Sequence, residues 1–162
     1  SCSDALVEAI DLVPTLTEYA GAEVCSERME GRSLAPLMQG GLPSGSWRDY
    51  IISEIDYSDR GPRTLLNLHP YDCRARVIRT RQWKYVLHER FRPQLYNLVD
   101  DPNEFEDLGD DPTFAEVRAD LHEALFAWHR KLKSRTEAQA DQLLTMGPER
   151  DEADFGILIG HW

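Results

Sequence analysis

Five cationic side chains lie within residues 74–84 of an otherwise acidic chain: Arg74, Arg76, Arg79, Arg81 and Lys84. A positively charged wall beside a cleft would attract an anionic substrate. Charge runs are weak indicators of function, however, because they more often form solvated strand faces that pair with Asp and Glu. We favour the paired interpretation.

A second polar group occupies residues 68–73, where His69, Tyr71 and Asp72 could border a cleft. Polar residues are expected in any loop, so this group does not by itself indicate a site. His122 and His129 lie seven residues apart, whereas a metal-binding pair on a helix is usually spaced i to i+4. We expect packing or surface roles for both histidines, and we assign no catalytic, substrate-binding or metal-binding residue in this chain.

The three cysteines form an odd set without the short paired spacing of a zinc site: Cys2, Cys25 and Cys73. An odd number of thiols cannot form a complete disulfide framework. We therefore expect reduced cysteines, some of them in the core.

The composition is that of one acidic globular chain. Its 162 residues suit a single domain with a substantial core. The formal net charge of −11 argues against nucleic acid or an anionic membrane as the main partner. No apolar run is long enough to span a bilayer, and no signal-peptide pattern begins at Ser1. Because the chain does not start with methionine, Ser1 need not be a native N-terminus, and localisation stays unknown.

Residues 50–99 predict a small antiparallel sheet of about four strands. The first strand covers residues 50–55. In residues 83–88 the alternation places Trp83, Tyr85 and Leu87 on one face of the sheet, which suits a sheet with one covered side. Residues 80–82 and 90–93 are short enough to connect the later strands.

Residues 112–133 predict a long helix that covers this sheet. Asp111 caps it and Pro112 opens it. Its apolar positions recur at three- and four-residue steps: Phe114, Val117, Leu121, Leu125, Trp128 and Leu132. We expect Trp128 to pack against Trp83 or Tyr85, and the fold class to be α+β.

The N-terminal part predicts a strand at residues 5–10 followed by a helix. Asp11 should cap this helix, Leu12, Leu16 and Tyr19 should form its apolar face, and Gly21 should end it. Further along, we expect Ser33 to cap a short helix carrying Leu34, Leu37 and Met38. Residues 40–46 form a Gly/Pro/Ser-rich loop that we interpret as a boundary, and residues 56–70 should be mostly irregular.

Three segments resemble the C-terminal subdomain of the sulfatases, members of the alkaline phosphatase superfamily. They are RTRQWKY at residues 79–85, LYNL at residues 95–98 and DPNEFEDL at residues 101–108. Two upstream segments, IDLVPTL at residues 10–16 and EGRSLAPL at residues 30–37, resemble the last strand and helix of the sulfatase catalytic domain. The resemblance implies that residues 5–39 are a remnant strand and helix of that α/β domain, attached in front of the sheet.

The resemblance also implies a chemistry, the hydrolysis of sulfate, phosphate or phosphonate esters. In the family this reaction needs a divalent metal (Mn, Ca, Mg or Zn) and a formylglycine nucleophile made within a C/S-x-P-x-R motif. No cysteine or serine here begins such a motif. The pairs Asp100-Asp101 and Asp110-Asp111 occupy turn or capping positions. We expect a C-terminal fragment of a hydrolase that lacks the catalytic residues, binds no cofactor itself and is inactive alone. The alternative is a non-catalytic module that assembles the enzyme or covers its substrate cleft.

The segments SEIDYS at residues 53–58, FRP at residues 91–93 and the ending FGILIGHW at residues 155–162 most resemble the phosphonate monoester hydrolase branch of this family. That branch favours a cytoplasmic location and oligomers formed partly through C-terminal segments. An apolar ending is unusual for a free tail. We therefore expect a homo-oligomer, acting on a small-molecule ester in the parent protein. The expected domains are residues 1–45, 46–135 and a tail at 136–162.

Overall fold

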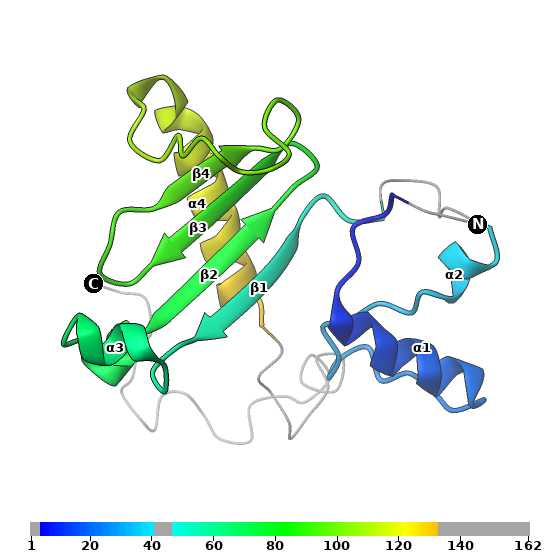
Figure 1. Cartoon of the computed structure of the whole chain (residues 1–162). Helices are drawn as coiled ribbons and strands as arrows, with labels where there is room; N and C mark the ends of the chain where they lie inside the picture. The colour runs from blue at the N-terminus through cyan, green and yellow to red at the C-terminus, as the bar shows by residue number, and fades with distance from the viewer. Residues whose placement is uncertain (1–3, 41–46, 133–162) are drawn as a thin grey trace, which may run out of the picture.

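The computed structural model describes residues 4–40 and 47–132. We call residues 4–40 the N-terminal lobe and residues 47–132 the sheet unit. The lobe holds α1 (Leu12–Tyr19) and α2 (Ala35–Met38), and the sheet unit holds four strands with α4 (Ala115–Arg130) packed behind them. Figure 1 shows the lobe beside the sheet rather than over either of its faces. The division of the chain into domains at residues 45 and 135 stays a prediction.

The sheet is a simple antiparallel meander in the order β1-β2-β3-β4. Its strands are β1 (Ile51–Asp56), β2 (Arg74–Arg79), β3 (Trp83–His88) and β4 (Gln94–Asn97). The register aligns Ile52, Ile78, Tyr85 and Leu95 in one row across all four strands. The α+β class and the strand positions are thereby confirmed.

The tight turn between β2 and β3 is stabilised by Thr80. Its hydroxyl accepts hydrogen bonds from the backbone N–H groups of Gln82 and Trp83, at 3.2 and 2.8 Å. A threonine at the start of a short connection can satisfy these turn donors locally. This bonding fixes the register in which Ile78 faces Tyr85.

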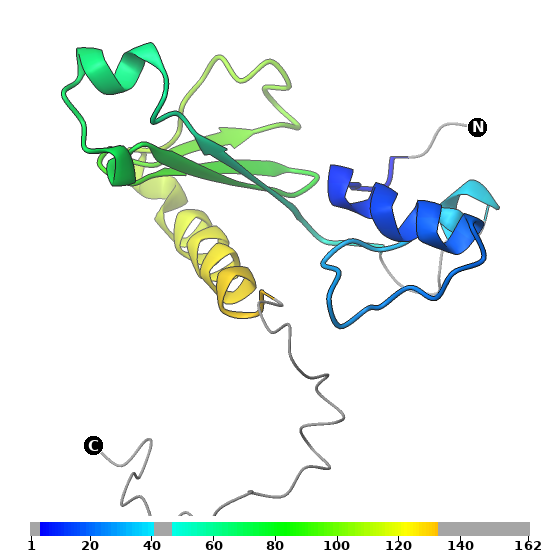
Figure 2. The same cartoon turned by 90° about the horizontal axis from the view of Figure 1, so that it is seen from below.

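Helix α4 begins as predicted at an Asp cap. The Asp111 side chain accepts the Thr113 N–H at 2.8 Å, and a 3₁₀ turn (Pro112–Phe114) leads into the helix. Leu121 and Leu125 are buried against the sheet residues Ile78, Tyr85 and Leu95. In Figure 2 the helix runs below the sheet, while the short α3 (Gly61–Leu65) lies on the opposite side.

Trp128 also packs against this core, as its place on the apolar stripe predicts, but it stays partly buried. The ring that contacts Trp83 is Phe114, at a centroid distance of 5.5 Å. Phe114 belongs to the 3₁₀ turn that leads into α4, so it is the start of this helical segment that reaches the indole of Trp83. Figure 1 shows α4 crossing behind the sheet.

The predicted strand at residues 5–10 is wrong. Residues 4–8 are not part of any strand, and Ala9–Asp11 forms a 3₁₀ turn. A strand requires a neighbour that satisfies its backbone groups, and no strand in the described part of the chain pairs with this segment. Instead, the Glu8 N–H donates to the Asp11 carboxylate at 2.8 Å.

The helix that follows shows its predicted apolar face to solvent. Leu12, Leu16 and Tyr19 are all exposed, whereas Pro14 and Thr15 are buried. Gly21 follows the helix in the left-handed conformation, with φ 73°, and so confirms the predicted helix end. The exposed face therefore has no partner among the described residues.

Three smaller predictions have mixed outcomes. Residues 56–70 are not wholly irregular, because Gly61 and Pro62 begin the short helix α3, where proline suits the first turn. The Ser33 hydroxyl accepts the Ala35 N–H at 3.2 Å, immediately before α2. The boundary loop at residues 41–46 and the tail at residues 133–162 lie outside the described residues. No helix in the described ranges is long and apolar enough to cross a membrane.

Candidate functional site

A buried carboxylate at the start of α1 is held by an unusually complete set of hydrogen bonds. Asp11 is fully buried, and its two oxygens accept four hydrogen bonds. The donors are the Glu8 N–H at 2.8 Å, the Arg32 N–H at 2.8 Å, and both terminal nitrogens of Arg48 at 2.9 and 2.8 Å. The predicted capping role is wrong, because this side chain accepts no hydrogen bond from an N–H of α1.

These contacts also set the acidity of Asp11. Burial alone would raise the pKa of the carboxyl group. The hydrogen bonds from Arg48 and from the Arg32 and Glu8 N–H groups outweigh burial, so the pKa lies below its ordinary value. An ionised, fully coordinated carboxylate holds the surrounding segments together and has no lone pair left for acid–base work.

Arg48 carries the same network into the sheet. Its guanidinium also contacts Glu8 Oε2 at 2.9 Å, and Glu8 Oε1 accepts the Ile52 N–H of β1 at 2.6 Å. The Arg48 and Glu8 side chains are 9% and 15% exposed, so both charges are largely withdrawn from water. We call Glu8, Asp11 and Arg48 the junction clamp, because they join the N-terminal lobe to the sheet unit.

The loop before α2 packs tightly on the clamp. A Cβ added at Gly31 would lie 2.1 Å from the Ile10 carbonyl oxygen, so only glycine allows this approach. The neighbouring Arg32 side chain donates to the Trp47 carbonyl at 2.5 Å. Thr15 completes the attachment: its hydroxyl donates to the Asp11 carbonyl and accepts the Leu34 N–H at 2.8 Å.

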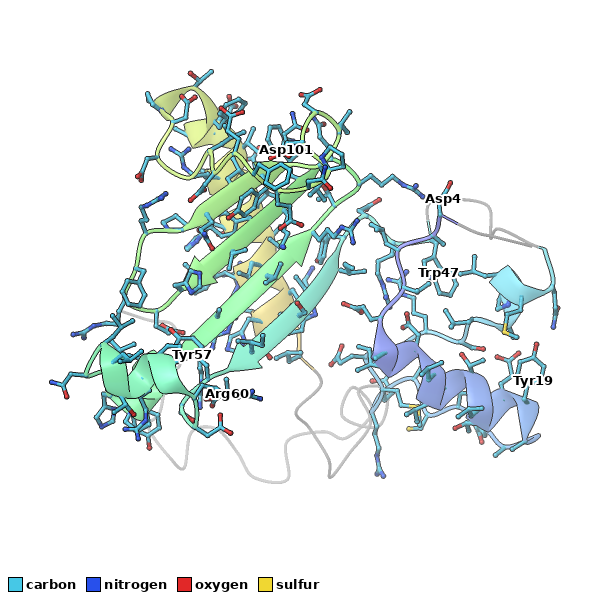
Figure 3. The ribbon with its side chains drawn as sticks, viewed as in Figure 1. Asp4, Tyr19, Trp47, Tyr57, Arg60 and Asp101 are labelled. Atoms are coloured by element: carbon cyan, nitrogen blue, oxygen red, sulfur yellow. The ribbon has the colours of Figure 1, made fainter. Side chains whose placement is uncertain are left out.

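Beside the clamp lies a hollow of 690 Å³. Its walls come from both parts of the chain, with Ile10 and Ser26 on the lobe side and Tyr50 and Trp128 on the sheet side. Trp47 lines it too and is 8% exposed. Figure 3 shows Trp47 between the sheet and α2. We call this cavity the junction hollow.

The basic cluster singled out in the sequence is mostly paired. Arg76 contacts Glu54 at 2.8 Å and Glu89 at 2.6 Å, Arg74 lies 3.7 Å from Asp56, and Lys84 pairs with Glu104. Burial lowers the pKa of Arg76, but the bonds to Glu89 and Glu54 outweigh it and raise the value overall. The paired interpretation is confirmed for these three cations. Within the described ranges Arg79 and Arg81 are exposed and make no ion pair.

The loop residues His69, Tyr71 and Asp72 lie near Tyr57, whose hydroxyl donates to the Asp72 carbonyl at 3.4 Å. Figure 3 shows Tyr57 beside α3, away from Trp47. Tyr71 is 74% exposed and its N–H donates to His69 Nδ1, while Asp72 lies 3.6 Å from Arg90. The structure does not bring these residues together with the junction clamp. A small apolar hollow of 280 Å³ near them has a separate lining.

Two of the cysteines and both helix histidines have the modest roles expected. Cys73 is completely buried, and burial raises the pKa of its thiol. Cys25 is half-buried. The His122 ring bonds the Tyr85 hydroxyl at 3.0 Å, and His129 contacts the Trp128 ring. Cys2 lies outside the described residues. The described ranges contain no group of three or more His, Cys, Asp or Glu residues able to hold a metal ion.

Residues 1–131 match the protein family described as N-sulphoglucosamine sulphohydrolase, C-terminal. The chain belongs to this family. The matched range covers the lobe, the clamp and nearly all of the sheet unit, so this C-terminal sulfatase domain includes the residues that form the junction hollow.

Curated relatives extend the same assignment. The chain is 33% identical over 132 residues to the multifunctional alkaline phosphatase superfamily protein PehA of Trinickia caryophylli, across 80% of this chain and 25% of that protein. It is 30% identical over 130 residues to the uncharacterized sulfatase YidJ of Escherichia coli, across 80% of this chain and 24% of that protein. The C-terminal sulfatase domain thus spans about a quarter of the length of these relatives.

Solved structures agree with the fold. The phosphonate monoester hydrolase of Agrobacterium radiobacter superposes with a TM-score of 0.70 at 30% identity, over 79% of this chain and 26% of that one. The phosphonate monoester hydrolase from Silicibacter pomeroyi gives a TM-score of 0.70 at 28% identity, over 80% and 26%. The resemblance to sulfatases and phosphonate monoester hydrolases is therefore confirmed.

Sequence reasoning missed the clamp. The relevant signals were present, since Asp11 stands in an apolar run and Arg48 follows Trp47 directly. Nothing in either segment indicated that two residues 37 positions apart would pair.

Proposed function

We propose that this chain is the C-terminal part of a hydrolase that cleaves sulfate, phosphate or phosphonate esters of small molecules. The supporting observation is the family match over residues 1–131, joined to 33% identity with PehA across only a quarter of that protein. In this proposal the catalytic groups lie in the part of the enzyme that precedes the region matched here.

The chain's own acidic residues do not suit the divalent metal that such an enzyme would use. Asp11 has its oxygens filled by four donors. Asp101 accepts the Glu106 N–H and Asp111 accepts the Thr113 N–H, so these carboxylates serve turns and caps. Asp110 pairs with Arg92 at 3.2 Å. We therefore assign the metal and the formylglycine nucleophile to the preceding part, and no catalytic step to this chain.

The role that remains for the C-terminal domain is to cover and brace the catalytic part. The junction clamp supports this role, because it attaches the sheet unit rigidly to α1. The apolar side chains of α1 that face solvent, Leu12 and Leu16, are then available for the catalytic part to bury. Burial of such leucines stabilises a contact by about 1.5–3 kcal/mol each.

A homo-oligomer is the second element of the proposal. Phe105 and Val99 favour it, because they are 87% and 66% exposed although they belong to hydrogen-bonded turns of the sheet unit. Exposed apolar groups on an ordered surface are typical of protein–protein contacts. Light scattering on the intact chain and on a chain ending at Arg150 tests whether the tail at 136–162 contributes.

The function is tested with a chimera in which residues 1–162 replace the matched C-terminal quarter of PehA. We expect the chimera to hydrolyse aryl sulfate, phosphate diester or phosphonate monoester substrates in the presence of Mn²⁺, Ca²⁺ or Zn²⁺. The isolated chain should show no turnover under the same conditions. Turnover by the isolated chain that is lost on mutation of one of its own residues would contradict the proposal.

A further inference from the structure

The indole nitrogen of Trp47 is a buried donor without an acceptor. Among the described residues it is the one buried side-chain nitrogen or oxygen that lacks a hydrogen-bond partner. Burying an N–H without an acceptor costs the free energy of its lost hydration. Nearly all buried donors in proteins have a protein or ordered-water partner, so this exception needs an explanation.

The groups that flank this donor in the chain are bonded to one another rather than to the indole. The Trp47 carbonyl is held by Arg32 at 2.5 Å, and the adjacent Arg48 is fixed by Asp11 and Glu8. The backbone on both sides of the indole is therefore anchored. Each oxygen of Glu8, the clamp carboxylate that also lines the hollow, already has a partner: the Ile52 N–H for Oε1 and Arg48 for Oε2.

The donor lines the junction hollow, which has room for an inserted segment of chain. The cavity measures 690 Å³ and has both apolar walls, such as Ile10 and Trp128, and polar ones, such as Ser26. A polypeptide loop offers this combination of apolar side chains and carbonyl oxygens. A purely apolar ligand would leave the indole N–H unpaired.

The surface next to the hollow also lacks a cover. Seven of the fifteen exposed large hydrophobic side chains of the described residues belong to the small N-terminal lobe: Val7, Ile10, Leu12, Val13, Leu16, Tyr19 and Met38. Ile10 belongs both to this group and to the lining of the hollow. The relatives carry about three quarters of their length beyond the region matched here, which is enough chain to cover such a surface.

We infer that the junction hollow is a docking site for the preceding catalytic part of the hydrolase. A loop of that part enters the hollow, and one of its backbone carbonyl or carboxylate oxygens accepts the Trp47 Nε1–H bond. The inference rests on the proposed function, since it requires a catalytic part to exist. It adds a specific polar anchor at the centre of an otherwise apolar contact.

The test compares Trp47→Phe in two contexts, the isolated chain and the PehA chimera. Phenylalanine keeps an aromatic ring and removes the donor. Trp83→Phe is the matched control for the loss of ring volume, because Trp83 lies in the sheet core outside the hollow. Relative to this control, Trp47→Phe should leave the Tm of the isolated chain unchanged or raise it, and lower the Tm of the chimera by roughly 2–4 °C.

Two results would overturn the inference. Equal effects of Trp47→Phe in both contexts would mean that water or nothing accepts the bond. A loss confined to the isolated chain, and abolished by ending that chain at Leu132, would identify the tail at 133–162 as the acceptor. Substrate turnover by the chimera is scored separately, so a failure of the proposed function is distinguishable from a failure of this docking site.

A second measurement serves if the chimera does not fold. The separately produced catalytic part of PehA is added to the ¹⁵N-labelled chain, and the indole resonances are followed. Docking should shift the Trp47 indole signal, assigned with Trp47→Phe, and leave that of Trp83 in place. An unmoved Trp47 signal in a complex detected by light scattering would overturn the inference.

Discussion

Replacing Arg48 by methionine should lower the free energy of unfolding by about 3–5 kcal/mol, the usual loss when one partner of a buried ion pair is removed. Arg48 supplies two of the four donors of the fully buried Asp11, and it also contacts Glu8. The substitution preserves much of the side-chain volume but leaves a buried carboxylate half satisfied. Urea unfolding followed by tryptophan fluorescence at pH 7 gives the value.

The exposed Arg79 provides a matched control, because it makes no ion pair within the described ranges. Arg79→Met should change stability by less than about 0.5 kcal/mol. The double variant Asp11→Leu/Arg48→Met should recover part of the loss, since it removes both buried charges together. A loss below about 1 kcal/mol for Arg48→Met would refute the idea that the clamp joins the two parts of the chain.

The same variant has a defined pH dependence. Because the folded-state pKa of Asp11 lies below its ordinary value of 3.8, its contribution to stability is fully present above that value and is lost as pH falls through the folded pKa. Without Arg48, burial is opposed by fewer hydrogen bonds, so the carboxyl group should take up its proton at a higher pH. The stability gap between wild type and Arg48→Met should therefore narrow between pH 7 and pH 3. A constant gap would contradict the pKa argument.

Three further substitutions, two of them paired with a control variant, test the packing and capping of the fold. Leu125→Ala should cost about 2–5 kcal/mol in urea unfolding because Leu125 is 1% exposed in the core, whereas Phe105→Ala, at an 87% exposed position, should leave stability nearly unchanged. Gly31→Ala should lower the free energy of unfolding by roughly 1–3 kcal/mol or more, because its Cβ would lie 2.1 Å from the Ile10 carbonyl oxygen. Gly61→Ala is the control and should be tolerated, because a Cβ there meets nothing within 4 Å. Equal urea midpoints for the two variants would contradict the close contact at Gly31. Asp111→Ala should cost about 1 kcal/mol by removing the cap on the Thr113 N–H, and an unchanged thermal unfolding curve would show that the cap contributes nothing.

The sheet unit could be predicted from the sequence because its organisation is local. Trp83, Tyr85 and Leu87 alternate with the two-residue period of a strand, and the Asp111-Pro112 pair marks the helix start. Neighbouring strands pair in chain order through short turns. Family motifs in the same stretch also identified the sulfatase relationship.

The N-terminal lobe could not be predicted in this way, because its conformation depends on groups far apart in the chain. The apolar residues 5–10 have the composition of a strand, but strand structure requires a hydrogen-bonding neighbour, which the described residues do not offer. The face of α1 that carries Leu12 and Leu16 has the spacing of a buried face, yet it is exposed. Amphipathic spacing shows which side chains favour burial but does not identify the surface that buries them.

The sequence by itself determined the fold class, the strand positions and the family of this chain, because periodicity, turn residues and motifs are local properties. Only the tertiary structure decided what Asp11 does. A helix-capping aspartate and a buried ion-pair partner look identical in sequence, and the choice depends on whether an arginine 37 residues away reaches it. The same holds for Trp47, because only the tertiary structure shows that its indole N–H is buried without an acceptor among the described residues.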